Sequence, residues 1–171
     1  MNDLLIKLTS GTKTDLGNSN EVITLVGNNP EQFDKLFDGL FSENELVLLR
    51  TADILNKITD KHPELIQRKK IDLLNGLDVF KSTEVRWHVS LLLYKSGLQG
   101  DEVALVLETL LKWLKEEDHK FVKVNCLQAL ANIAIENPEL KYEVGLIINE
   151  EMEKGSASIK ARGRKLLKML A

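Results

Sequence analysis

The sequence predicts an all-α protein, a right-handed α-α superhelix (an α-solenoid) of stacked helical pairs, and three observations support this. Apolar residues recur three or four positions apart through most of the chain, as on one face of a helix. The helical segments repeat with a period of about 37 residues. No stretch alternates apolar and polar residues for long enough to form a strand. Because one helical pair cannot bury its own apolar stripe, the copies are expected to stack on a continuous core.

The period is clearest in the first helix of each pair, where three apolar positions align across the copies. Aligned residues are 37 apart, and the middle position carries mostly small side chains. The three aligned sets are Leu48, Val85, Val122 and Ile159; Ala52, Val89, Cys126 and Gly163; and Leu55, Leu92, Ala129 and Leu166. Small side chains in the middle set would let neighbouring helices approach closely.

A second helix is expected between successive first helices. In the third copy its apolar stripe is Val103, Leu107, Leu110, Leu111 and Leu114. In the second copy Lys70 falls in this stripe, and Ile71 is expected to replace it in the core. Three second helices are predicted to begin at a proline followed by an acid, because proline at the first helical position loses no hydrogen bond. These prolines are Pro30, Pro63 and Pro138, and Asp101 opens the remaining copy.

In chain order, the predicted helices cover residues 3–9, 19–27, 30–41, 44–60, 64–77, 83–96, 101–116, 119–136, 139–153 and 157–170. We expect one domain over residues 1–171. Its repeats are placed at about 19–41, 44–77, 83–116 and 119–153, with a C-terminal capping helix at 157–170.

Composition narrows the class of protein. The chain has 23 Lys and Arg against 26 Asp and Glu, a net charge of -3, which argues against a dedicated nucleic-acid binder. One cysteine excludes an internal disulfide. No run approaches the ~20 apolar residues of a membrane span, and the N-terminal apolar stretch is only Leu4 to Ile6, so neither a membrane helix nor a signal peptide is expected. The expected location is the cytoplasm.

Three segments resemble the first helix of HEAT repeats, a family within the armadillo-like superhelices. They are residues 83–89 (TEVRWHV), 120–126 (KFVKVNC) and 158–163 (SIKARG). Each places a basic residue directly after a β-branched apolar residue and a small or apolar residue three positions later. The resemblance covers most of residues 19–170 and implies a scaffold that binds other proteins. It is specific for architecture and says almost nothing about the partner.

No catalytic, cofactor-binding or metal-binding constellation is found in the sequence. His62, His88 and His119 occupy three different positions of the repeat, so convergence on one metal is not expected. Cys126 falls in the small core position and is predicted to be a buried thiol rather than a nucleophile. The chain is therefore predicted to be non-enzymatic.

The predicted partner-binding surface lies on the second helices, which in HEAT-like proteins usually line the concave side. Val106 and Trp113 are seven residues apart and form an apolar stripe beside the core stripe, so Trp113 is a candidate anchor. In repeat register Lys69 aligns with Val106, and Arg68 and Tyr142 align beside it. The alternative is that Trp113 packs into the next helical pair.

Two rival functions rest on the final helix. Its basic residues could meet phosphate or an acidic partner in a nucleic-acid-associated or repair role, although a solvated cap is favoured. They are Lys160, Arg162, Arg164, Lys165 and Lys168. An enzyme or accessory enzyme subunit would instead require a pocket with convergent ionisable groups. Self-association is the other possibility, because apolar residues crowd the same helix. These are Leu166, Leu167, Met169 and Leu170.

Overall fold

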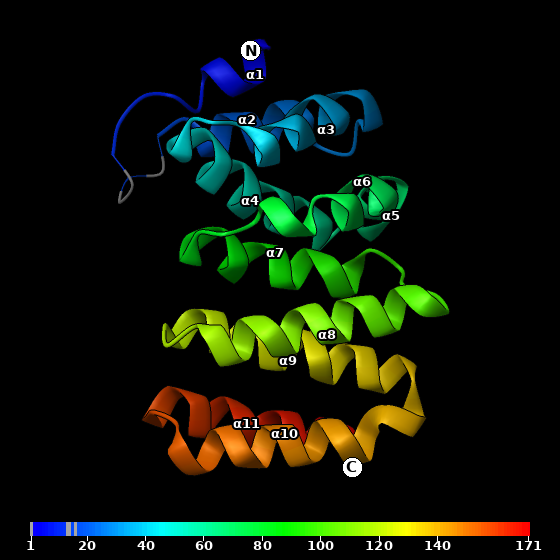
Figure 1. Cartoon of the computed structure of the whole chain (residues 1–171). Helices are drawn as coiled ribbons and strands as arrows, with labels where there is room; N and C mark the ends of the chain where they lie inside the picture. The colour runs from blue at the N-terminus through cyan, green and yellow to red at the C-terminus, as the bar shows by residue number, and fades with distance from the viewer. Residues whose placement is uncertain (1, 13–14, 16) are drawn as a thin grey trace. The chain divides into compact units, whose positions relative to one another are not determined.

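The computed structural model describes residues 2–12, 15 and 17–171, and within these ranges it is made of helices joined by short loops (Figure 1). No strand is found in these ranges. The predicted all-α class is confirmed. The handedness of the superhelix stays a prediction.

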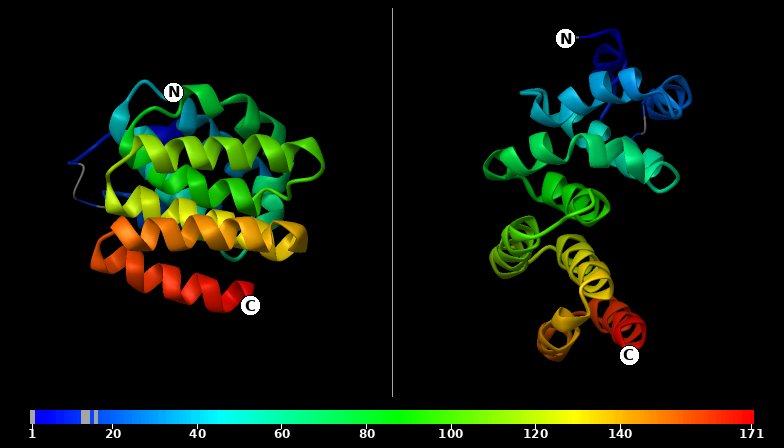
Figure 2. Two further views of the ribbon diagram at one scale, coloured as in Figure 1. Left: turned by 60° about the horizontal axis from the view of Figure 1, so that its bottom comes forward. Right: turned by 90° about the vertical axis from the view of Figure 1, so that its right-hand side faces the viewer.

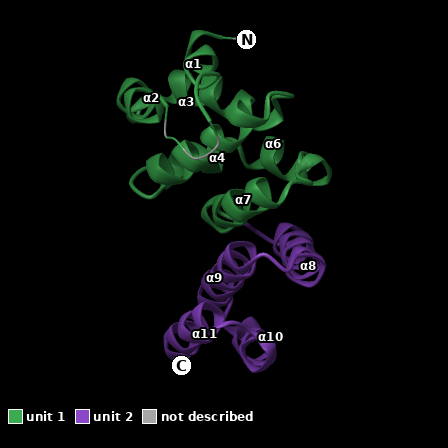
Figure 3. Cartoon of the chain, turned by 90° about the vertical axis from the view of Figure 1, so that its left-hand side faces the viewer, with its two compact units in different colours: residues 1–97 green, residues 98–171 purple. Residues whose placement is uncertain are grey.

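The chain divides into two compact units, residues 1–97 and residues 98–171 (Figure 3). The first unit contains α1 (Asp3–Ile6), α2 (Ser19–Val26), α3 (Pro30–Phe37), the 3-10 turn η1 (Asp38–Phe41), α4 (Glu45–Thr59), α5 (Pro63–Arg68), α6 (Lys70–Asn75), η2 (Leu77–Val79) and α7 (Thr83–Lys95). The second contains α8 (Asp101–Glu116), α9 (Lys120–Glu136), η3 (Pro138–Leu140), α10 (Lys141–Lys154) and α11 (Ala157–Leu170). The boundary separates α7 from α8, inside the predicted repeat 83–116, and the assignment of one domain over residues 1–171 stays a prediction.

The helix starts follow the predicted signals. Pro30 and Pro63 are the first residues of α3 and α5. The Asn29 side chain accepts hydrogen bonds from the first backbone N–H groups of α3, which otherwise have no partner within the helix. Pro138 differs, because it opens the 3-10 turn η3 and α10 begins only at Lys141.

The expectation that Ile71 replaces Lys70 in the core is wrong. Ile71 is 68% exposed, whereas the half-buried Lys70 extends its ammonium to the carbonyl oxygen of Gly97 at 3.1 Å. The predicted helix over 64–77 is interrupted at Lys69 (φ -98°, ψ 10°), so α5 and α6 do not continue one register. A lysine can bury its aliphatic stem and still place its charge on a polar partner.

In the first unit, α4 packs against α7 through a polar network as well as an apolar core. The Asn56 amide, 7% exposed, donates to the carbonyl oxygen of His88 at 2.8 Å. The Lys95 ammonium donates to the Asn56 carbonyl oxygen at 3.2 Å and to Asp60 Oδ1 at 2.6 Å. These groups keep their hydrogen bonds on burial, so the network fixes how the two helices pair without a large desolvation cost.

Arg50 on α4 holds the segment that precedes α2. Its guanidinium is 5% exposed and donates to the carbonyl oxygens of Leu8 (2.9 Å), Ser10, Thr12 (2.9 Å) and Asp15, and to Asp15 Oδ1 at 2.7 Å. The Asp15 carboxylate also accepts from the backbone N–H of Thr12 at 2.6 Å, which is the main reason its pKa is lowered. One side chain therefore organises several residues of irregular backbone.

The second unit has two layers. The right-hand view of Figure 2 and Figure 3 both place α8 and α10 on one side and α9 and α11 on the other. α9 contacts α8, α10 and α11, and most of its surface is buried. Gly163 of α11 belongs to the predicted small set, and a Cβ built there would lie 3.2 Å from Ile148 Cγ2 and closer still to Met152. The predicted close approach is thus found between α10 and α11.

Replacing Arg50 with methionine is expected to lower the free energy of unfolding by about 2 kcal/mol or more, because several charge-assisted hydrogen bonds are lost. Arg50→Lys should recover little, since one ammonium cannot reach acceptors arranged around a planar guanidinium. Urea unfolding measures both. Equal stability of the wild type and Arg50→Met would show that the segment before α2 is not held by this contact.

Replacing Gly163 with leucine should destabilise the chain by about 2 kcal/mol, because the added atoms overlap α10. The matched control is Gly145→Leu on α10, where a Cβ meets only Leu167 Cδ2 at 4.0 Å. That change should be neutral or stabilising by up to about 1 kcal/mol, since glycine is a poor helix former. Thermal unfolding of both variants tests the close packing, which equal losses would contradict.

Candidate protein-binding surfaces

The structure places two of the five predicted partner-binding residues in the core. Val106 is 0% exposed and Trp113 is 2% exposed, so neither side chain is accessible to a partner. The alternative that Trp113 is a core residue is favoured, and Val106 and Trp113 are withdrawn as anchors. The reason is that the buried face of α8 is formed by Val106, Leu110, Trp113 and Leu114, whereas Val103, Leu107 and Leu111 of the predicted core stripe are only partly buried.

Tyr142, by contrast, is 79% exposed on α10. Leu146 lies one turn further along the same face and is 52% exposed, and Leu105 on α8 is 45% exposed. The buried residues of α10 include Val144 and Ile148, on the opposite face. Leu146 is not among the residues predicted from the sequence to bind a partner. Its sequence signal was its position four residues after Tyr142, which places both side chains on one helix face, outside the core stripe.

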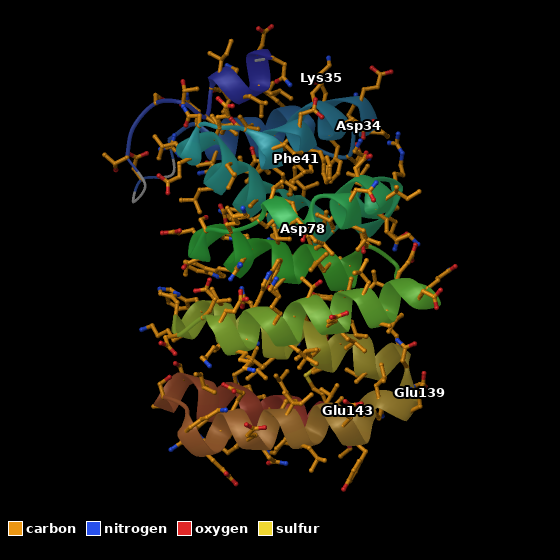
Figure 4. The ribbon with its side chains drawn as sticks, viewed as in Figure 1. Asp34, Lys35, Phe41, Asp78, Glu139 and Glu143 are labelled. Carbon is orange, nitrogen blue, oxygen red and sulfur yellow. The ribbon has the colours of Figure 1, made fainter. Side chains whose placement is uncertain are left out.

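Acidic side chains outnumber basic ones on the helices that carry these apolar side chains. Over α8, η3 and α10, all in the fully described second unit, seven carboxylate side chains are exposed against three lysines. The acids are Asp101, Glu108, Glu116, Glu139, Glu143, Glu150 and Glu153, and the lysines are Lys112, Lys115 and Lys154. Figure 4 labels Glu139 and Glu143 near the start of α10. This layer, the acidic α8/α10 face, would attract a basic segment.

Arg68 and Lys69, the other two predicted residues, belong to the first unit, and Lys69 lines a separate hollow. Arg68 lies 3.5 Å from the Asp34 carboxylate. The Lys69 ammonium lies 2.5 Å from Asp72 Oδ2 and 5.0 Å from the centre of the Phe37 ring. A cavity of about 460 Å³ opens here, and its lining includes Phe37, Lys69, Asp72 and the 45% exposed Phe41 (Figure 4). An aromatic ring beside paired charges is typical of a surface that binds proteins.

His88 lies in a second hollow of the first unit, of about 330 Å³, with Arg50, Asp53, Lys57 and Trp87 in its lining. The His88 ring stacks on Trp87, with ring centres 4.9 Å apart and planes at 11°. Burial lowers the pKa of the imidazole, and the Asp53 carboxylate opposes part of that shift. Burial therefore favours the neutral imidazole of His88 at neutral pH, where its ring packs on Trp87.

The described residues meet the requirements of neither a metal site nor a membrane-spanning helix. Among them no group of three His, Cys, Asp or Glu side chains could hold a metal. Across the same part of the chain, every helix is too short or too polar to cross a membrane. The Cys126 thiol is 0% exposed, as expected of a small core side chain.

The terminal helix uses its apolar residues mainly for the core. Leu166 is 0% exposed and Leu170 is 7% exposed, whereas Met169 is 46% exposed. Most of the apolar surface that suggested self-association is therefore already covered by the rest of the chain. Self-association through α11 stays a prediction.

The repeated helices and their exposed apolar and charged surfaces define an α-helical repeat protein. The HEAT repeat domain matches residues 11–170, and the chain belongs to the HEAT repeat family. Its period of about 37 residues is slightly shorter than the ~40–47 usual for such repeats. The searches of curated proteins and of solved structures found no match. HEAT repeat proteins commonly mediate protein–protein interaction and are generally non-catalytic.

The lowered pKa of His88 predicts an acid-sensitive component of stability. Well above pH 6.5 the ring is neutral in both the folded and the unfolded state and adds no pH dependence. Below about 6.5 the unfolded chain takes up the proton first, so the free energy of unfolding falls until the pH passes the folded pKa. His88→Gln should remove this component. Urea unfolding of both proteins at several pH values measures it, and parallel pH profiles would show that His88 does not contribute.

Proposed function

We propose that the chain is a non-enzymatic adaptor that binds a partner protein through the acidic α8/α10 face. The observation that carries the proposal is the pair Tyr142 and Leu146, exposed on successive turns of α10 outside the core stripe. A tyrosine supplies a large contact area and a hydroxyl at a low cost in side-chain entropy. Residues of this type dominate the binding energy of protein interfaces.

The surrounding acids suggest the chemistry of the partner. A segment with lysine or arginine beside apolar side chains would place its apolar groups on Tyr142 and Leu146 and its charges near Glu139, Glu143 and Glu150. An amphipathic helix or an extended peptide meets this requirement, and rigid helices offer either of them a preformed surface. The hollow beside Lys69 in the first unit is a second candidate contact, and Arg68 and Lys69 stay predicted contributors.

The double variant Tyr142→Ala/Leu146→Ala is expected to lose at least about tenfold in partner affinity while keeping its fold, because both side chains are exposed. The measurement is affinity capture from a native, nuclease-treated lysate, followed by a titration of each captured protein. Circular dichroism of the variant checks the fold.

The matched control is Ile71→Ala, which removes an exposed apolar side chain from the first unit. It should leave capture unchanged. A protein retained by the wild type and the control but lost by the double variant supports the proposal, and raised salt should weaken its binding. If the double variant captures the same proteins as the wild type, the α8/α10 face is not the binding surface.

A further inference from the structure

The charged side chains of the second unit are sorted by layer. α9 and α11 expose five basic side chains against one acid, Glu136, the reverse of the α8/α10 face. The basic side chains are Lys120, Lys160, Arg164, Lys165 and Lys168. The net charge of -3 conceals this separation, because the acids of the other layer cancel it in the sum.

A groove runs between α9 and α11 within this basic layer. It encloses about 360 Å³, and its lining includes Phe121 and Val124 of α9 and Ala161, Arg162 and Lys165 of α11. None of the side chains that line it in this fully described unit is a carboxylate. The groove thus combines an apolar floor with a positive rim.

Two side chains of the groove are suited to recognition. The half-buried Arg162 donates from Nη1 to Gln128 Oε1 at 2.7 Å, which fixes its guanidinium and leaves other N–H groups available. Phe121 is 42% exposed, with the Lys120 ammonium 5.1 Å from its ring centre. A held guanidinium loses little entropy when it pairs with a carboxylate, and an exposed aromatic ring favours an apolar contact beside that pair.

We infer that the α9/α11 groove binds an acidic peptide segment of a partner protein that carries at least one large apolar side chain. The carboxylates of the segment pair with Arg162 and Lys165, and its apolar side chain packs on Phe121 and Val124. Charge complementarity favours an acidic occupant, because the rim of the groove is basic. The apolar floor at Val124 and Ala161 favours a peptide over a phosphate group, because a phosphate group would make no apolar contact with it. This site is on the opposite layer from the α8/α10 face, so one chain could hold two partners of opposite charge.

The test is a selection of short random peptides against the full chain. The selected peptides should be enriched in Asp and Glu around a Phe, Trp or Leu. A fluorescein-labelled consensus peptide should then bind Lys165→Glu at least about tenfold more weakly than the wild type, with the fold checked by circular dichroism. The matched control Lys115→Glu reverses an exposed lysine on α8 and should leave binding within about twofold.

Phe121→Ser should also weaken the peptide, whereas Tyr142→Ala/Leu146→Ala should not, which separates this site from the proposed function. Selected peptides without acidic enrichment, or equal binding by Lys165→Glu, would overturn the inference. A labelled oligonucleotide that binds more tightly than the peptide and displaces it would assign the groove to nucleic acid instead. A dimer seen by sedimentation and lost in Lys165→Glu would assign it to a second copy of the chain.

Discussion

Burial of the first helices is the constraint on which the rest of the second unit depends. α9 contacts three other helices, and apolar or small side chains cover most of its surface, including Cys126 and Ala129 at 0% exposure. A helix enclosed in this way fixes the distance and direction of its neighbours, because protein interiors tolerate few voids and little overlap. α11 approaches closely for the same reason, since Gly163 leaves room for Met152 and Ile148 of α10. Most polar groups of the second unit therefore lie at the helix ends and outer faces, and the buried Glu151 carboxylate pairs with Lys123.

The repeat made the helices and much of the core predictable. Aligned residues 37 apart identified which positions are buried, and Ala52, Val89 and Cys126 are all 0% exposed. The width of the buried surface was not predictable, because apolar residues cover more than half the circumference of α8. Nothing in that pattern tells whether Trp113 contacts a neighbouring helix or solvent. The prediction that Ile71 is buried is wrong for a different reason. The helix breaks between α5 and α6, which shifts the register locally, and no sequence signal marks this break.

In α7 and α9, the basic residue that follows the first aligned apolar residue has a structural role that the sequence did not reveal. Arg86 donates from Nε to the carbonyl oxygen of Phe80 at 3.0 Å, and Lys123 donates to the carbonyl oxygen of Leu114 at 3.1 Å. Both acceptors belong to the backbone just before the helix that carries the donor, where carbonyl groups at the end of the preceding helix or turn lack intrahelical partners. Lys123 also pairs with the buried Glu151 at 3.1 Å. Arg86 and Lys123 therefore join successive helices, and a basic residue at this position of the repeat does not by itself indicate a binding role.

The separation of charge in the second unit follows from the same helical order. Helices of one layer alternate in sequence with those of the other, so acidic and basic segments alternate along the chain and nearly cancel in its net charge. Folding gathers α8 with α10 and α9 with α11, and only then do the two charged faces exist (Figure 3). Each face also exposes an aromatic side chain, Tyr142 on one and Phe121 on the other, which offers an apolar contact that the charges do not provide. In the proposed adaptor, two faces of opposite charge would distinguish two partners, since each face would repel the partner of the other.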